Sequence, residues 1–179
     1  MASRVLILFA HPALHRSRIN AALMEAVQGM EGVTFRDLYE EYPTLHVDVE
    51  TEQELLLEHD VIVWQHPFYW YSAPALLKEW QDVVLEYGFA YGEGGTRLVG
   101  KRVLSALTTG GPEEAYQKTG YNRFTMRELL APFAQTSFLC GMEYLEPFII
   151  HGVRGLTAEQ VQEWAQRYRA RIAALVAGD

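Results

Sequence analysis

Short, continuously apolar runs separated by segments with helical spacing constrain the fold more than any other feature of the chain. Val5–Ala10 reads VLILFA, and Asp60–Gln65 reads DVIVWQ. Runs without polar alternation are typical of strands buried on both faces, as in parallel sheets covered by helices. Between these runs, apolar residues recur at helical spacing over Ile19–Met30. Strands that alternate with helices in this way predict right-handed crossovers and a parallel sheet.

The remaining elements continue the alternation. We predict further strands at Val33–Leu38, at Arg102–Thr108 and within Phe138–Ile150. We predict four further helices. The first opens at a capping box of Thr51 and Glu54, and the second runs from Pro74 to Tyr87. The third spans Arg123–Phe133, and the fourth runs from a capping box at Thr157 to about Val176. Five strands in one uninterrupted domain, residues 1–179, fit an α/β three-layer sandwich with the flavodoxin-like strand order 2-1-3-4-5.

The composition argues against a nucleic-acid-binding protein, a disulfide-bonded protein, a metalloprotein and a membrane protein. The net charge of −8 lacks the basic footprint of a nucleic-acid-binding surface, so we expect no nucleic-acid partner. Cys140 is the only cysteine, so no disulfide can form within the chain. His11 and His15 have no nearby carboxylate or cysteine to complete a metal site, and we expect no metal. The first apolar run is too short to span a membrane and lacks a cleavage signature, so we expect a cytoplasmic protein.

In a sheet of this order, ligands bind beyond the carboxyl ends of the strands, at the switch point between the first and third strands. The first candidate loop, His11–Asn20, leads into a helix whose N-terminal amides and dipole favour an anion. Ser17 and Asn20 can donate hydrogen bonds to a phosphate, and Arg16 or Arg18 would add positive charge. The alternative is that Ser17 only caps the helix and that the arginines are solvated.

The second candidate loop, His66–Pro74, carries four consecutive aromatic residues at the end of a buried strand, Phe68 to Tyr71. Some of them must face away from the core. A planar ligand would explain them, because aromatic side chains stack on a flat ring system or meet its edge. The alternative is a dimer contact or ordinary core packing. A ligand site and a dimer contact are compatible if the site lies at a subunit interface.

The third candidate loop, Thr108–Pro112, contains the pair Gly110 and Gly111. Paired glycines leave backbone N–H groups exposed and allow a ligand to approach the chain closely. Such amides can hydrogen-bond to the polar edge of a flavin and stabilise negative charge on its reduced ring. A Gly-Gly pair can equally make only a turn. Its position after the fourth strand is what favours a binding site.

Five stretches read FAHPALHRSRIN, VWQHPFYWYSAPALLKEWQDVV, YGFAYGEGGTRLVGK, TTGGPEEAYQKTGY and FLCGMEYLEPFIIHG. Together they span nearly the whole chain and resemble the NAD(P)H:quinone oxidoreductase branch of the flavodoxin-like flavoproteins. The nearest resemblance is to the KefF-type ancillary proteins of glutathione-regulated potassium efflux and to their stand-alone relatives.

The resemblance implies a bound flavin, either FMN or, alternatively, FAD. Its phosphate would lie near His11 and the helix start, and its ring would lie between the aromatic loop and the paired glycines. The cofactor-binding residues that the resemblance implies are His11, Ser17, Arg18, Ile19, Asn20, Pro67, Phe68, Tyr69, Trp70, Tyr71, Thr108, Thr109, Gly110 and Gly111.

In the wider family, a tyrosine and a histidine beyond the glycine pair interact with the O2 region of the flavin. Tyr116 stands at the place of the tyrosine, and the resemblance gives it the catalytic role. The place of the histidine holds Asn122. An amide carries no proton at neutral pH, which argues against a Tyr–His relay in this chain.

The resemblance implies an enzyme that passes hydride from NAD(P)H to the flavin and then two electrons to a quinone. Both half-reactions would use one pocket of a homodimer in a ping-pong mechanism. An alternative role is a regulatory subunit of a potassium-efflux membrane protein, which would bring the chain to the inner face of the membrane. A third hypothesis is an electron-transfer flavodoxin without a hydride donor.

Overall fold

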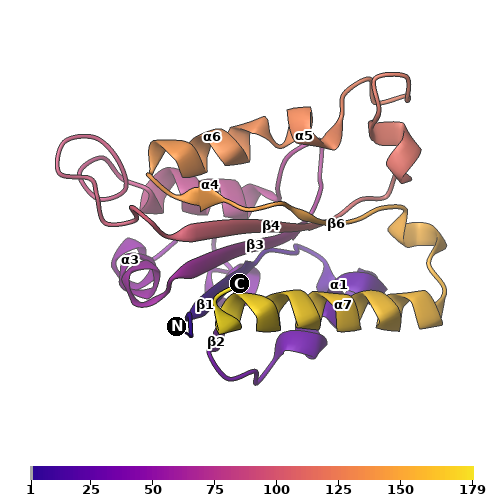
Figure 1. Ribbon diagram of the computed structural model, residues 1–179, viewed down its shortest axis with the longest axis horizontal. Helices are drawn as coiled ribbons and strands as arrows, with labels where there is room; N and C mark the ends of the chain where they lie inside the picture. The colour runs from indigo at the N-terminus through magenta and orange to yellow at the C-terminus, as the bar shows by residue number, and fades with distance from the viewer. Residues whose placement is uncertain (1) are drawn as a thin grey trace.

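The computed structural model describes residues 2–179, and its centre is a parallel sheet of six strands (Figure 1). The strand order is β2-β1-β3-β4-β5, and β6 also pairs with β4. This confirms the predicted flavodoxin-like order and adds a sixth strand to it. The strands are β1 (Val5–Phe9), β2 (Val33–Asp37), β3 (Val61–Pro67), β4 (Arg102–Thr108), β5 (Glu143–Tyr144) and β6 (Phe148–Ile150).

A bulge divides the fifth strand of the prediction into β5 and β6. Val103 pairs with Tyr144, and Ala106 pairs with Phe148. The two residues between Val103 and Ala106 therefore lie opposite the three residues of Leu145–Pro147. A bulge of this kind interrupts the ladder and bends the strand, and proline has no N–H to give to the ladder. The interruption explains why no continuous apolar run marks this strand in the sequence.

Each face of the sheet is covered by its own helices (Figure 1). Val5 and Ile7 pack against α1 (Arg18–Val27) and α7 (Ala158–Ala177). Leu6 and Leu8 belong to the core on the other face. The helices that contribute to that core are α2 (Leu38–Glu41), α3 (Val49–Glu58), α4 (Ala75–Val84), α5 (Met126–Leu129) and α6 (Ala131–Leu139). Three short 3-10 helices lie in the loops: η1 (Leu14–Arg16), η2 (Glu113–Tyr116) and η3 (Val153–Gly155).

Asp48 caps α3, so the predicted capping box at Thr51 is wrong. The Asp48 carboxylate accepts hydrogen bonds from the Thr51 amide at 3.2 Å and from the Thr51 hydroxyl at 2.9 Å. A carboxylate is a stronger acceptor for first-turn amides than a hydroxyl, and it also interacts favourably with the helix dipole. The other predicted capping box is confirmed, because Thr157 and Gln160 form it at the start of α7.

Two of the predicted helices have different bounds in the structure. Thr125 caps α5, and Leu130 separates this helix from α6, so the helix predicted over Arg123–Phe133 is two short ones. α4 ends at Val84, before Tyr87. No helix among residues 2–179 is long and apolar enough to cross a membrane.

Candidate functional site

A cavity of about 440 Å³ opens where β1, β3 and β4 end. The three loops predicted from the sequence meet in this cavity, and η3, which follows β6, completes its wall. The cavity therefore lies at the carboxyl edge of the sheet, where this strand order places a ligand. Its lining residues are His11, Ala13, Arg16, Ser17, Asn20, Pro67, Phe68, Tyr69, Thr108, Gly110, Val153 and Arg154.

The start of α1 offers the cavity both donors and an unpaired acceptor. Ser17 Oγ caps the helix by accepting from the Asn20 amide at 3.3 Å, and it also accepts from Asn20 Nδ2 at 2.9 Å. Because Ser17 accepts both bonds, its own hydroxyl proton is free to donate. Asn20 Nδ2 also donates to Thr108 Oγ1 at 3.1 Å, whereas the buried Asn20 Oδ1 has no partner within residues 2–179. A buried polar atom left alone is destabilising, so this corner of the cavity is suited to a polar ligand.

Two arginines line the same cavity. Arg16 precedes α1, and Arg154 comes from η3. Arg18 is directed elsewhere, because its Nη2 donates at 2.9 Å to a backbone carbonyl just before α7. Ile19 is buried in the core beneath α1, so only its backbone amide can face a ligand. Positive charge beside free helix amides favours an anionic group such as a phosphate.

His11 lies at the end of β1 as a neutral donor. Its Nδ1 accepts a hydrogen bond from the Ala13 amide at 3.1 Å, so the proton of the neutral ring is on Nε2. Burial lowers the pKa of His11 and keeps the ring uncharged at pH 7. The ring meets that of Tyr69 edge-on, with 6.2 Å between the centroids.

The aromatic loop is a tight turn with an unfavourable backbone conformation. Trp70 and Tyr71 have φ angles of 48° and 62°, and the Ser72 amide donates to the Tyr69 carbonyl at 2.9 Å. Consecutive left-handed residues are typical of a type I′ turn, which normally contains Asn-Gly or Gly-Gly. The turn leaves Trp70 with 93% of its surface exposed. Strain of this kind is found at functional sites, where a particular side-chain position is needed.

A smaller hollow of about 180 Å³ adjoins the cavity, and the two share Phe68. Its walls also include Trp70, Tyr71, Tyr116, Tyr121 and Asn122. The Tyr71 hydroxyl donates to Asn122 Oδ1 at 3.1 Å and so links the aromatic turn to the segment beyond η2. Asn122 therefore holds the side chain of Tyr71 by this hydrogen bond.

The loop Thr108–Pro112, here called the glycine turn, is fixed between β3 and the end of β6. The Phe68 amide donates to the Thr108 carbonyl at 2.8 Å. A Cβ at Gly111 would lie 2.7 Å from the Tyr121 hydroxyl and 3.3 Å from the Tyr116 hydroxyl, so a larger residue here would displace the Tyr121 side chain and crowd Tyr116. A Cβ at Gly110 would lie 3.5 Å from Arg154 Nε. Within residues 2–179 the Gly110 amide donates no hydrogen bond, which leaves it available to a ligand in the cavity.

Tyr116 and His151 pack against each other beside the glycine turn. Their ring centroids are 5.3 Å apart, and His151 Nδ1 lies 3.1 Å from Thr109 Oγ1. Burial raises the pKa of Tyr116, so its hydroxyl is protonated at neutral pH. Burial also lowers the pKa of His151, an effect that Glu113 and Glu114 oppose.

The sequence did not indicate Arg154 and His151, although both follow a strand. Their loop comes after β6, whose end the interrupted apolar pattern leaves undefined. The rule that ligands bind beyond strand ends would have included these residues once Ile150 was known to end a strand.

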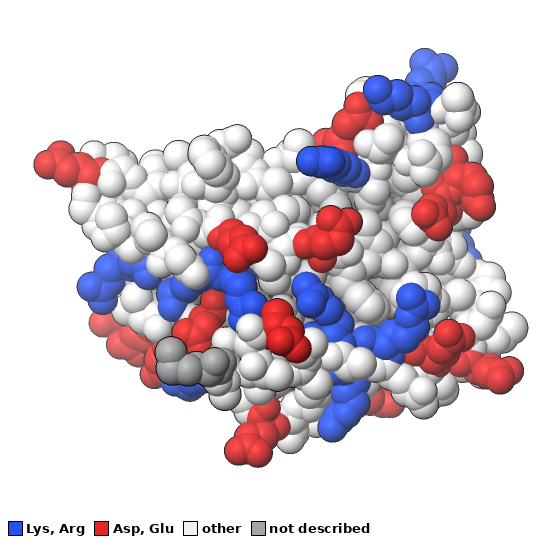
Figure 2. All heavy atoms as spheres, in the orientation of Figure 1, with Lys and Arg blue, Asp and Glu red and all other residues white. Residues whose placement is uncertain are grey.

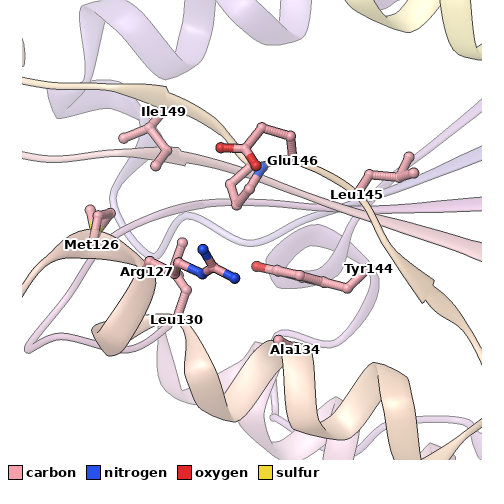
Figure 3. Close-up of a pocket in the computed structure, with 9 residues that line it drawn as sticks. Met126, Arg127, Leu130, Ala134, Tyr144, Leu145, Glu146 and Ile149 are labelled. Atoms are coloured by element: carbon pink, nitrogen blue, oxygen red, sulfur yellow. The ribbon is translucent and has the colours of Figure 1, made fainter.

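A second cavity, of about 500 Å³, lies between α5, α6 and the bulge at Leu145–Pro147 (Figure 3). Figure 3 shows Arg127 and Tyr144 among the side chains around it, which come from α5, α6 and the bulged edge of the sheet. It contains none of the residues implied by the resemblance, and neither the start of α1 nor the glycine turn borders it. The strand-end cavity is therefore the candidate active site, although it is the smaller of the two.

The sheet is doubly wound, and it has a cavity at the start of α1 and an aromatic hollow beside it. These features define a class of α/β protein that binds ligands at its strand ends. The sequence matches the family model for the flavodoxin-like fold over residues 3–172. The chain therefore belongs to this family.

Two curated relatives match nearly the whole chain. One is the glutathione-regulated potassium-efflux system ancillary protein KefG of Yersinia enterocolitica, which is 48% identical over 165 residues, covering 92% of this chain and 90% of the relative. The other is general stress protein 14 of Bacillus subtilis, which is 46% identical over 164 residues, covering 92% and 94%.

Three solved structures share the fold over most of their length. General stress protein 14 of Treponema denticola, in complex with FMN, has a TM-score of 0.90 and 37% identity, covering 96% of this chain and 99% of that one. An NADPH-quinone reductase from P. pentosaceus has a TM-score of 0.85 and 34% identity, covering 94% and 96%. A protein named as a thermophilic tryptophan halogenase from Streptomycin violaceusniger has a TM-score of 0.91 and 46% identity, covering 93% and 97%.

Proposed function

We propose that the chain is an FMN-dependent NAD(P)H:quinone oxidoreductase. The observation that carries the proposal is the junction, at Phe68, of a cavity lined by Ser17 and two arginines with an aromatic hollow. A ligand with a planar ring and a phosphate on its side chain fits both parts, the ring in the hollow and the phosphate in the cavity. Similar proteins support the choice, because one was crystallised with FMN and another is named an NADPH-quinone reductase.

The residues present fit such a cofactor. The α1 amides, Ser17, Arg16 and Arg154 would hold the phosphate, and the unpaired Asn20 Oδ1 would accept from a polar group of the ligand. The turn of Phe68 to Tyr71 and the glycine turn would hold the ring on either side. FMN rather than FAD is proposed because of the FMN-bound relative. The flavin supplies the chemistry when bound, by accepting a hydride and giving up two electrons.

The protein's own part is to orient the reactants and to stabilise charge. The aromatic hollow would exclude water from the reacting groups and place donor and acceptor in turn at one position, as a ping-pong reaction requires. The Gly110 amide, and the Tyr116 hydroxyl that remains protonated at pH 7, would donate hydrogen bonds where negative charge develops. No acidic side chain is needed for these roles.

We also propose a homodimer. Tyr121, at the mouth of the hollow, is exposed, and a second group of exposed apolar side chains lies on Tyr87, Val99, Phe138 and Leu139. Figure 2 shows a wide area without charged side chains over α6. Exposed apolar patches of this kind are typical of protein interfaces. Analytical ultracentrifugation should give twice the mass of the chain, and a monomer at micromolar concentration would exclude the dimer.

Reconstitution with FMN tests the proposed enzyme. The purified protein should quench FMN fluorescence in a 1:1 complex. Without a quinone, NAD(P)H should reduce the bound flavin once, and steady-state oxidation of NAD(P)H should require a quinone. A protein that FMN cannot reconstitute would refute the proposal. A flavin complex that NAD(P)H fails to reduce would instead indicate an electron-transfer flavodoxin.

A second candidate function is regulation of a potassium-efflux membrane protein, since close relatives are named KefG ancillary proteins. Such a role would bring the chain to the inner face of the membrane through its partner. Co-purification with the transporter and restored potassium efflux in cells would support it. An enzyme that is fully active and never associates with the transporter would count against it.

A further inference from the structure

His151 is a titratable group beside the candidate site to which the resemblance gives no role. It directly follows β6, and backbone hydrogen bonds fix it on both sides. The Thr109 amide donates to the Ile150 carbonyl at 2.9 Å, and the Gly152 amide donates to the Gly111 carbonyl at 2.8 Å. These bonds extend the pairing of β4 with β6 beyond the strand ends. The backbone therefore ties His151 to the glycine turn, and the imidazole does not depend on a free loop for its position.

The side-chain contacts of Thr109 define the tautomer of His151. Thr109 Oγ1 donates its single hydroxyl proton to the Gly111 carbonyl at 2.8 Å. With that proton assigned to the carbonyl, Oγ1 accepts from His151 Nδ1, which lies 3.1 Å away. The neutral imidazole consequently carries its proton on Nδ1. Burial lowers the pKa of His151 and so favours this neutral form at pH 7.

The imidazole also supports Tyr116. The two rings lie 5.3 Å apart with an angle of 36° between their planes. The Tyr116 hydroxyl lies at the glycine turn, 3.3 Å from the position of a Cβ on Gly111. The ring of His151 thus packs against the tyrosine that reaches the glycine turn, while its Nδ1 contacts the side chain of Thr109.

We propose that His151 is a positioning residue of the candidate site: it holds Tyr116 and Thr109 at the glycine turn, through ring packing and through one hydrogen bond. The inference rests on the proposed function, because the position of the Tyr116 hydroxyl matters through a ligand held at this turn. The histidine that contacts Tyr116 in this chain is therefore His151, which follows β6. Position 122 holds an asparagine.

Two variants separate the two contacts of His151. H151F keeps a ring against Tyr116 and removes the donor to Thr109, whereas H151N keeps a donor near the place of Nδ1 and removes the ring. H46N, at an exposed position remote from these contacts, is the control. The hydrogen bond lost in H151F is internal to the protein, so its loss is expected to lower the folding equilibrium constant about fivefold.

Two measurements test whether His151 positions Thr109 and Tyr116. In the flavin-free protein, ¹⁵N NMR should show the Nδ1–H tautomer of His151 at pH 7, and T109V should abolish that preference. In the FMN complex, H151F and T109V should each make the midpoint potential of the flavin more negative, because donors that stabilise the reduced ring become less well placed. The double variant should shift the potential no further than either single one, H151N should lie nearer to the wild type, and H46N should match it.

The possible failures are distinguishable. A protein that binds FMN but shows the same potential in all variants would overturn the role of His151 and leave the proposed function intact. An Nε2–H tautomer in the flavin-free protein would overturn the hydrogen bond to Thr109 and with it the inference. A chain that takes up no FMN would overturn the proposed function itself.

Discussion

At the scale of single residues, Ser17 has two tasks at the start of α1. Its hydroxyl oxygen caps the helix, and its hydroxyl proton remains free beside the cavity. The sequence left open whether Ser17 caps the helix or binds phosphate. The structure confirms the cap, and phosphate binding by the same hydroxyl remains a prediction.

Replacement of Ser17 by alanine should affect both tasks. We expect the free energy of unfolding to fall by about 1 kcal/mol through loss of the cap. We expect the Kd for FMN to rise about tenfold or more, because a hydrogen bond to a charged phosphate is lost. Urea denaturation and fluorescence titration measure the two effects. D48A removes the cap of α3 instead and should destabilise the fold without changing the Kd; an equal rise in Kd for both variants would contradict a direct contact with the phosphate.

His66 makes folding stability depend on pH. It is fully buried, its Nδ1 lies 3.0 Å from the Pro67 carbonyl, and its Nε2 has no partner within residues 2–179. Burial lowers its pKa from 6.5 to about 4. The unfolded chain therefore binds a proton between these two pH values, whereas the folded chain does not.

Stability should consequently be complete above pH 6.5 and should fall as the pH drops towards 4. The contribution of His66 to this loss is at most about 3 kcal/mol, from 1.36 kcal/mol per pKa unit. Urea denaturation at pH 7, 5.5 and 4.5 would measure it, and H66F should flatten the slope. Three further histidines with lowered pKa add to the loss in the wild type, namely His11, His59 and His151. If H66F kept the full slope, His66 would not be the principal source.

At the scale of elements, the aromatic turn after β3 combines strain with exposure. Trp70 and Tyr71 adopt left-handed conformations that cost about 1–3 kcal/mol each for such residues. Replacing them with Asn and Gly should suit the type I′ turn and raise the free energy of unfolding by about 1–2 kcal/mol. Quinone reduction should fall at least tenfold in kcat/KM, because the walls of the hollow are lost.

Leu45 offers a matched control for the aromatic turn. It also has a positive φ, 62°, and it is exposed, but it lies outside both hollows of the site. L45N should therefore stabilise the fold and leave quinone reduction unchanged. Full activity in the doubly substituted turn would show that Trp70 and Tyr71 have no part in binding the reactants.

Elements with strong local signals could be predicted from the sequence, and those shaped by distant contacts could not. β1 and β3 appear as unbroken apolar runs because both of their faces are buried. The edge strand is different, because the bulge at Leu145–Pro147 divides it into β5 and β6. Neither part is long enough to form a continuous apolar run. The start of α3 was misplaced because Asp48 and Thr51 are both good caps, and only the surrounding chain decides between them.

At the scale of the whole molecule, the strand order determined most of the candidate site. The loops after β1, β3 and β4 could be identified in advance, since a parallel sheet gathers its carboxyl ends at one edge (Figure 1). Which side chains from these loops face the cavity could not be foreseen. Arg18 and Ile19 face elsewhere because helix α1 packs that side against α7 and the core, and Arg154 comes from a strand end that was not recognised.

The measurement that tests the proposed enzyme most directly is the stoichiometry of quinone reduction. The FMN-reconstituted protein should oxidise one NAD(P)H for each quinone reduced by two electrons, with parallel lines in double-reciprocal plots as a ping-pong reaction requires. The flavin-free protein should show no such turnover. Steady-state oxidation of NAD(P)H at the same rate without a quinone, or equal rates with and without FMN, would contradict the assignment of this cavity to a flavin-dependent quinone reductase.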